Sequence, residues 1–500
     1  MKKLLMAVAV ATVIVILPSF KGLLEHIPRT WDLAAIEKFH LHPPDTNVQV
    51  TYAPASFYDS LPEHVIYKTY PVYYREFERP GYIDSLRQLK PEITFNPADL
   101  HTEQDWIKAG ELVFNWPAAY NSFNDKVLRA EAKGSSGKIP KDGAYLFNRY
   151  VLGADGKLMV GSMSCASCHT RVLESGEVAP GAQGNVYNNV GFAAAIHAGR
   201  IPFPILLDGI AQLNSAPWVK SKDQIRPANA KEFTDYLLSV PAGVIDRQGV
   251  AYLYPIPVPS LIGIKDIKYF DRTGLMKHDG PGDLMRYAAF NQGMDMFTSY
   301  DGFMPGGKNK MTLPLLAEWN HPFGYAARKY SDAQLYALTK YLYALKAPKN
   351  PNRFSKAMIT RGQQVFKAAG CVTCHTPPLY TNNKLTPVNG FEPPKDHFKK
   401  YDIFNASVET DSVSTLYSRR GTGYYKIPSL RNVWMQSAFF HNGNLASLEE
   451  VLDPKRLHDD YVPGGFKQPN VSTMAVKGHP FGLDLNERDK KALISFLKTL

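Results

Sequence analysis

Two pentapeptides decide the architecture: Cys165-Ala-Ser-Cys168-His169 and Cys371-Val-Thr-Cys374-His375. A Cys-x-x-Cys pair places two thiols about one helical turn apart, which suits thioether bonds to the two vinyl groups of one porphyrin. The adjoining histidine then lies beneath the iron as its axial ligand. The sequence therefore predicts two covalently bound haem c groups, with His169 and His375 as the proximal iron ligands.

Two other interpretations of a lone Cys-x-x-Cys are half of a zinc site and a thioredoxin-type redox pair. The histidine that follows each pair and the repetition of the whole motif favour haem. The 500-residue chain contains four cysteines, and all four belong to these motifs. No cysteine is left for a disulfide bridge.

The amino terminus has the features of an export signal. Lys2 and Lys3 precede an uncharged apolar run from Leu4 to Leu17, which Pro18 closes. The run matches the apolar core of a signal peptide and is shorter than the roughly 20 residues that span a bilayer. No clean cleavage site follows, so residues 1–20 are predicted to be a signal peptide or an N-terminal membrane anchor. The body of the chain is expected in the periplasm or elsewhere outside the cytoplasmic membrane.

The chain is basic, with a formal net charge of +11. Its basic residues are spread along the sequence without a run of five or more, so the pattern does not indicate a nucleic-acid partner. The charge suits an acidic protein partner or an anionic membrane surface, and it also describes an ordinary solvated basic surface.

An amphipathic helix is predicted before each motif and at the end of each unit. Residues 103–114 and 355–369 are the leading helices, with Gly110 and Gly362 in corresponding places. The closing helices follow Ser331 and Asn486, which are N-cap residues followed by a first-turn acid.

These repeats predict a mainly α fold of two cytochrome c-like haem domains. The N-terminal domain spans residues 101–347 and carries long loop-rich insertions, notably 180–281 and the stretch just before Cys165. A proline-containing linker leads into the C-terminal domain, residues 348–500. Residues 21–100 are rich in Tyr and Pro with weak periodicity, and are predicted to be a loop-rich extension packed on the first domain.

Three further segments carry a family resemblance. They are Gly421-Thr-Gly-Tyr-Tyr-Lys-Ile-Pro428-Ser-Leu-Arg431, Phe439-Phe-His441-Asn-Gly-Asn444 and Ser447-Leu-Glu-Glu450. Together with the two motifs, they resemble the bacterial di-haem cytochrome c peroxidase superfamily, from about residue 103 onward. That superfamily includes peroxidases, the di-haem enzyme that matures methylamine dehydrogenase, and di-haem rubber oxygenases. The long separation of the motifs is closer to that of the rubber oxygenases. The methionine ligand of the peroxidases' relay haem has no secure counterpart after His441.

The resemblance implies an exported redox enzyme of the peroxidase or oxygenase type, with electron transfer between its two haems. One haem would relay electrons, and the other would have an open face for peroxide or dioxygen. The implied partners are a small redox protein, as electron donor or acceptor, and a small oxidant or an apolar substrate. Calcium between the domains is a further implied cofactor, for which the sequence shows no ligand set. The alternative is a non-catalytic periplasmic electron-transfer cytochrome.

The sequence offers several candidates for the second axial ligands. For the second haem, His479 in a Gly-His-Pro loop is the first candidate, and its alternative role is that of a loop or propionate-contacting histidine. Met474 is the next candidate ligand, while His441 is expected to orient a propionate or a loop. For the first haem, His197 is either a sixth ligand or a structural histidine.

A distal pocket of the first haem is predicted from Phe290, as an apolar wall, and Gln292, as a hydrogen-bond donor to bound oxygen. The alternative is an ordinary buried helix face. No residue stands out in the sequence as a general acid or base.

Overall fold

The computed structural model describes residues 27–122, 128, 138–199, 202–204, 206–207, 227–247, 249–301 and 328–500. The predicted signal peptide or anchor, residues 1–20, lies outside this part of the chain. Among the described helices, none combines the length and the apolar character needed to cross a membrane.

Two crossed helices form the centre of the first unit. Helix α5 (Glu103–Asn115) begins at a capping box between Thr102 and Asp105 and packs against α13 (Asp332–Ala344), whose N-cap is Ser331. Both helices lie where the apolar periodicity predicts them. They cross at Gly110, where an added Cβ would run into the carbonyl oxygen of Ala337 and lie 2.7 Å from the Cβ of Tyr341. The absence of a side chain at Gly110 therefore allows the close approach.

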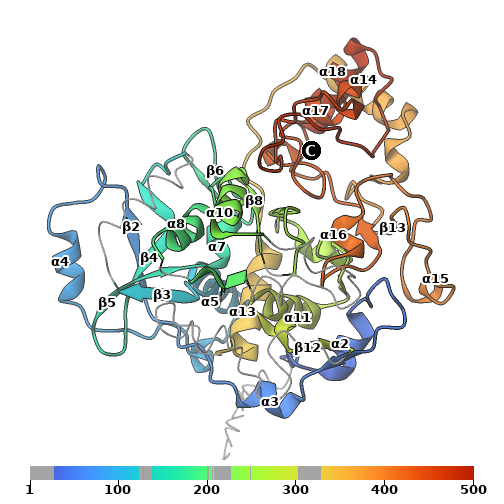
Figure 1. The fold of residues 1–500 in the computed structure, drawn as a ribbon. Coiled ribbons are helices and arrows are strands. Elements are labelled where there is room, and N and C mark those ends of the chain that lie inside the picture. The colour runs from blue at the N-terminus through green and yellow to red at the C-terminus, as the bar shows by residue number, and fades with distance from the viewer. Residues whose placement is uncertain are drawn as a thin grey trace, which may run out of the picture.

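The second unit repeats this arrangement with α14 (Lys356–Ala368) and α18 (Glu487–Leu497), at the upper right of Figure 1. Gly362 lies at the crossing, where an added Cβ would meet the carbonyl oxygen of Ala492 and lie 2.5 Å from the Cβ of Phe496. Arg361 donates two hydrogen bonds to the Asp489 carboxylate, at 2.7 and 2.8 Å, and so links the two helices.

A four-stranded antiparallel sheet lies at the left of Figure 1 and was not predicted. Its order is β2 (Thr69–Tyr73), β4 (Ala144–Leu152), β5 (Leu158–Ser162) and β3 (Ala119–Ser122). The sequence analysis assigned loops to the stretch before Cys165. Strand β4, Ala-Tyr-Leu-Phe-Asn-Arg-Tyr-Val-Leu, nevertheless has the aromatic and β-branched content that favours a strand.

The N-terminal extension contributes to the core of the first unit. It contains α2 (Leu33–Phe39), β1 (Val50–Tyr52), α3 (Ala55–Ser60) and α4 (Tyr82–Arg87), and β1 pairs with β12 (Thr298–Tyr300). Trp31 and Ile36 are buried against residues of α5, α13 and α11 (Pro281–Asn291). The extension therefore supplies buried side chains to the core of the first unit.

Short elements complete the first unit and carry the first motif. They are η1 (Pro97–Asp99), α7 (Cys165–Cys168), β6 (Thr170–Val172), β7 (Val178–Pro180), α8 (Val190–His197), α10 (Ala230–Ser239), β8 (Val244–Ile245), β9 (Ile256–Pro257), η3 (Ile264–Asp266), β10 (Tyr269–Phe270), β11 (Met276–Lys277) and η4 (Met294–Phe297).

The second unit has its own short elements: η5 (Cys371–Thr373), β13 (Leu385–Pro387), α15 (His397–Lys400), α16 (Val413–Leu416), β14 (Tyr424–Lys426), η6 (Val433–Met435), α17 (Leu448–Val451) and η7 (Pro454–Leu457).

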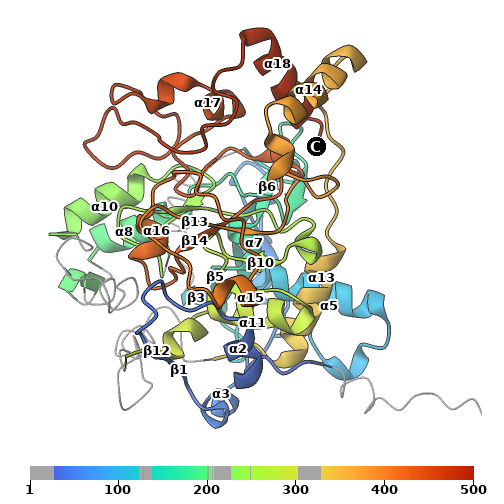
Figure 2. The same ribbon diagram turned by 90° about the vertical axis from the view of Figure 1, so that its right-hand side faces the viewer.

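The second half of the chain folds back onto the first, as Figure 2 shows for β13, β14 and α16. Arg419 and Arg420 are almost completely buried, and each donates to the Asp295 carboxylate of the first unit, at 2.8 and 2.7 Å. Burying such charges is unfavourable unless they are paired. This cluster therefore fixes the contact between the two halves.

Candidate di-haem site

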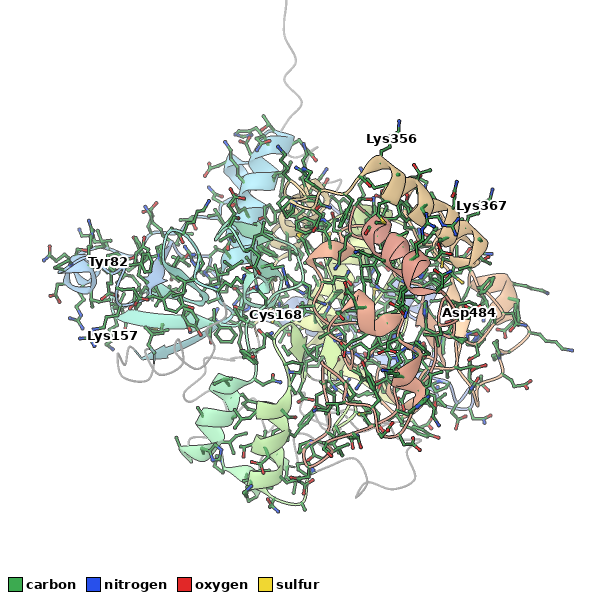
Figure 3. The ribbon with its side chains drawn as sticks, turned by 90° about the horizontal axis from the view of Figure 1, so that it is seen from above. Tyr82, Lys157, Cys168, Lys356, Lys367 and Asp484 are labelled. Atoms are coloured by element: carbon green, nitrogen blue, oxygen red, sulfur yellow. The ribbon has the colours of Figure 1, made fainter. Side chains whose placement is uncertain are left out.

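One large cavity is lined by both sequence motifs. Its volume is about 1660 Å³, and its walls include the cysteines and histidines at 165, 168, 169, 371, 374 and 375. Ordinary ligand pockets measure about 300–1,000 Å³. Figure 3 shows Cys168 between the lobe marked by Tyr82 and Lys157 and the C-terminal part marked by Lys356 and Lys367.

The first motif presents its histidine in the form that binds a metal. Helix α7 is capped by Ser164, and the His169 amide donates to the Cys165 carbonyl at 3.0 Å. The Nδ1 of His169 lies 2.9 Å from the carbonyl oxygen of Pro259, to which it donates, so Nε2 is left for a metal. Burial lowers the pKa of His169 to about 4, which keeps the ring neutral.

The second motif has the same local geometry. Gly370, at φ 75°, turns the chain from α14 into the motif, where the His375 amide donates to the Cys371 carbonyl at 2.9 Å. The Nδ1 of His375 donates to the carbonyl of Tyr380 at 3.1 Å, and the Pro428 backbone is a second hydrogen-bond partner of the ring. Burial lowers the pKa of this ring as well.

The cysteines do not fit the two alternative interpretations of the motif. All four are free, and burial raises the pKa of Cys165 to about 11 and that of Cys168 to about 12. A reactive redox pair needs a depressed pKa. The described residues contain no group of three or more His, Cys, Asp or Glu that could hold a metal ion, as a zinc site would require. Because the described residues offer no such ligand group, the calcium site implied by the family resemblance also stays a prediction.

The cavity also contains cationic side chains suited to porphyrin carboxylates. The buried Nε and Nη1 of Arg272 have no hydrogen-bond partner within the described structure. Lys426 also lines the cavity, and burial lowers its pKa to about 8. Buried donors of this kind are costly unless an acceptor satisfies them. The residues present therefore fit haem. The sequence did not indicate either cation as a site residue, because both lie far along the chain from the two Cys-x-x-Cys-His motifs.

The structure brings His479 to the second motif. The centroids of the His375 and His479 rings are 6.5 Å apart, and His479 lines the cavity. Metal–imidazole bonds of about 2 Å place two opposed ring centroids roughly 6 Å apart across one ion. The His479 backbone is fixed, since its amide donates to Val408 at 2.7 Å and Arg456 donates to its carbonyl at 2.8 Å.

The other two candidates in this unit are placed differently. Met474 is not among the residues that line the cavity. His441 lines it, but its ring stacks on Tyr425 at 4.5 Å and its Nε2 is 3.7 Å from the Asp411 carboxylate.

Of the candidates for the first haem, Gln292 alone lines the cavity. The Phe290 ring is buried in the core and stacks on Trp31 at 6.0 Å, because α11 directs Tyr287, Ala288 and Asn291 toward the cavity and Phe290 away from it. His197 is exposed at the end of α8 and does not line the cavity. The structure therefore places Phe290 in a buried helix face, which was the alternative expectation, and His197 outside the cavity wall.

Sequence comparisons identify relatives of part of the chain. A segment of 141 residues is 30% identical to the methylamine utilization protein MauG of Methylorubrum extorquens, covering 28% of this chain and 33% of the relative. A segment of 92 residues is 28% identical to the cytochrome c551 peroxidase of Nitrosomonas europaea, covering 18% and 25%. The matched part thus spans a quarter to a third of these relatives' length. No family model matches the chain.

A solved structure covers more of the chain at lower similarity. The diheme peroxidase BthA of Burkholderia thailandensis aligns over 87% of this chain and 93% of its own, at 16% identity and a TM-score of 0.25. These sequence relatives support the resemblance to the bacterial di-haem cytochrome c peroxidase superfamily that the sequence motifs indicate.

Proposed function

We propose that this chain is an exported di-haem enzyme that reduces peroxide with electrons from a small redox protein. Cys371, Cys374, His375 and His479 would hold the haem that supplies electron relay. Cys165, Cys168 and His169 would hold the haem that supplies the chemistry on the oxidant. Residues 101–347 and 348–500 are the corresponding haem domains in this proposal, and residues 1–20 direct export to the periplasm.

The observation that carries the proposal is the asymmetry between the two motifs. His479 stands 6.5 Å from His375, ring to ring. Among the described residues no histidine ring contacts the His169 ring in the same way, and Gln292 is the predicted distal residue that lines the shared cavity. An iron with one protein ligand has room for an oxidant, whereas an iron with two is suited to electron transfer.

The haem, when bound, supplies the iron redox chemistry, and the chain supplies attachment, orientation and a dry cavity. The thioethers of the four cysteines hold the porphyrins in place. The carbonyls of Pro259 and Tyr380 orient the two proximal rings. Gln292 can donate a hydrogen bond into the cavity but does not transfer a proton.

Spin-state spectroscopy tests the asymmetry in the purified holoprotein. Electron paramagnetic resonance should show one high-spin and one low-spin iron. His479→Ala should convert the low-spin iron to high spin, while His458→Ala, at an exposed site in the same unit, should leave both signals unchanged. Two low-spin irons in both redox states would instead indicate the electron-transfer cytochrome.

Turnover assays test the reaction itself. A reduced small cytochrome should be oxidised in the presence of hydrogen peroxide at a rate proportional to the amount of holoprotein. Oxygen uptake on an apolar polymer or lipid, without peroxide turnover, would replace the peroxidase with the oxygenase alternative.

A further inference from the structure

Asp246 is an acidic side chain in the haem cavity that none of the roles described so far uses. It directly follows β8 and lines the cavity. Its neighbour Arg247 also lines the cavity, and the charge of Arg247 contributes to lowering the pKa of His169, after the larger effect of burial. Arg247 therefore lies within electrostatic range of the first motif, and Asp246 is its immediate neighbour in the cavity wall.

A buried tyrosine holds the Asp246 carboxyl. The Tyr236 hydroxyl, on α10, donates to Oδ1 of Asp246 at 2.8 Å, and Tyr236 has no exposed surface. Burial raises the pKa of Tyr236, so the tyrosine keeps its proton and acts as the donor. This hydrogen bond fixes the carboxyl at the wall of the cavity.

Further ionisable side chains connect this pair with the outside of α10. The Tyr252 ring packs edge-on against Tyr236, with centroids 5.1 Å apart. The Tyr252 hydroxyl donates to Glu232 at 2.8 Å, and Glu232 is half-buried in the first turn of α10. The link from Asp246 to Glu232 thus consists of two hydroxyl–carboxylate hydrogen bonds joined by the ring contact between Tyr236 and Tyr252.

The two cations near Asp246, Arg247 and Arg272, interact with other side chains. Arg247 donates to the Asp271 carboxylate at 2.7 Å. Arg272 lowers the pKa of Tyr236, although by less than burial raises it. Among the described residues neither cation forms an ion pair with Asp246, so no cation holds this carboxyl in its ionised form. Burial raises the pKa of Asp246 to about 7, and the Tyr236 hydrogen bond opposes this shift.

We propose that Asp246 is the redox-linked proton site of the first haem. When the iron held by His169 gains one electron from the small redox protein, the Asp246 carboxylate takes up one proton from solvent. On reoxidation the carboxyl releases that proton. The physical reason is that the added electron makes the cavity more negative, and a carboxylate in a medium of low dielectric constant then becomes costlier to keep ionised.

The inference deepens the proposed function, but its test requires only that both haems are attached. The midpoint potential of the first haem is measured by spectroelectrochemical titration of the holoprotein from about pH 5 to pH 9, a range that brackets the carboxyl. Uptake of one proton per electron changes the reduction equilibrium tenfold per pH unit, which is about 59 mV for one electron. The wild-type potential should fall with this slope across the neutral range.

Two variants and one control decide the outcome. Asp246→Asn should remove the neutral-range slope. Tyr236→Phe removes a hydrogen bond that favours the carboxylate, so the sloping region should move to higher pH. Asp235→Asn, on the same helix at a site paired with Lys231, should leave the curve unchanged.

An Asp246→Asn protein with a normal haem spectrum and an undiminished slope would overturn the proposal. If that variant does not fold, Tyr236→Phe decides, and an unmoved sloping region would overturn it equally. Absence of peroxide turnover would contradict the proposed function and leave this titration interpretable.

Discussion

Replacement of Gly362 by alanine tests the helix crossing that supports the second haem motif. The added Cβ would meet the carbonyl oxygen of Ala492 and lie 2.5 Å from the Cβ of Phe496, whereas real Cβ contacts essentially never fall below 3.0 Å. Neither the carbonyl nor a Cβ can rotate away. Helices α14 and α18 must therefore separate locally.

Two opposing effects set the size of the change. Alanine favours a helix over glycine by about 1 kcal/mol. Overpacking of a tight core costs about 1–3 kcal/mol, and contacts with backbone place this site at the upper end. We expect Gly362→Ala to lower the free energy of unfolding by about 2 kcal/mol. The second haem should also be disturbed, because α14 leads directly into Gly370 and Cys371.

Urea unfolding followed by circular dichroism and by Soret absorbance measures both effects. Gln363→Ala, at an exposed position of the same helix, is the matched control and should change stability by less than about 0.5 kcal/mol. Gly110→Ala should have a comparable effect in the first unit. If Gly362→Ala were as stable as the control, the close crossing would not exist in solution.

Three further outcomes are expected. Arg419→Met should lower the free energy of unfolding, measured in urea, by about 3 kcal/mol or more, because the buried Asp295 carboxylate loses a partner. Burial raises the pKa of Asp295, but Arg419 and Arg420 outweigh burial and hold that pKa below its ordinary value. The stability from this cluster is therefore present at neutral pH and is lost on acidification below about pH 4. Asp246→Asn should become progressively more stable than wild type as pH rises from about 4 to 7, because the Asp246 carboxyl ionises at lower pH in the unfolded chain than in the folded protein. Each unit of pKa difference corresponds to about 1.4 kcal/mol. The free energies of unfolding of both proteins at pH 5 and pH 8 measure the difference. Met474→Ala should leave the low-spin signal in electron paramagnetic resonance, unlike His479→Ala, and a change in that signal would assign the ligand to methionine.

Local patterns were sufficient for the haem motifs and for the helices around them. Cys-x-x-Cys-His is specific because thioether and iron geometry act over a single turn. The leading and closing helices follow from caps and apolar periodicity, which also act within a few residues. The sheet around β4 had a usable signal in its aromatic and β-branched residues, which the loop assignment overlooked.

The shared cavity, and the side chains that line it, depend on segments far apart in the chain. His479 lies beside the motif at 371–375, about a hundred residues earlier in the chain, whereas Met474, five positions before His479, does not line the cavity. Phe290 and Gln292 are almost adjacent in sequence, yet α11 turns one into the core and the other toward the cavity. Arg272 and Asp246 belong to no motif, and Lys426 lies in the segment 421–431 without a role that its neighbours in sequence indicate. Their roles arise from burial and from the charges that packing brings near them, and no pattern of neighbouring residues encodes those distances.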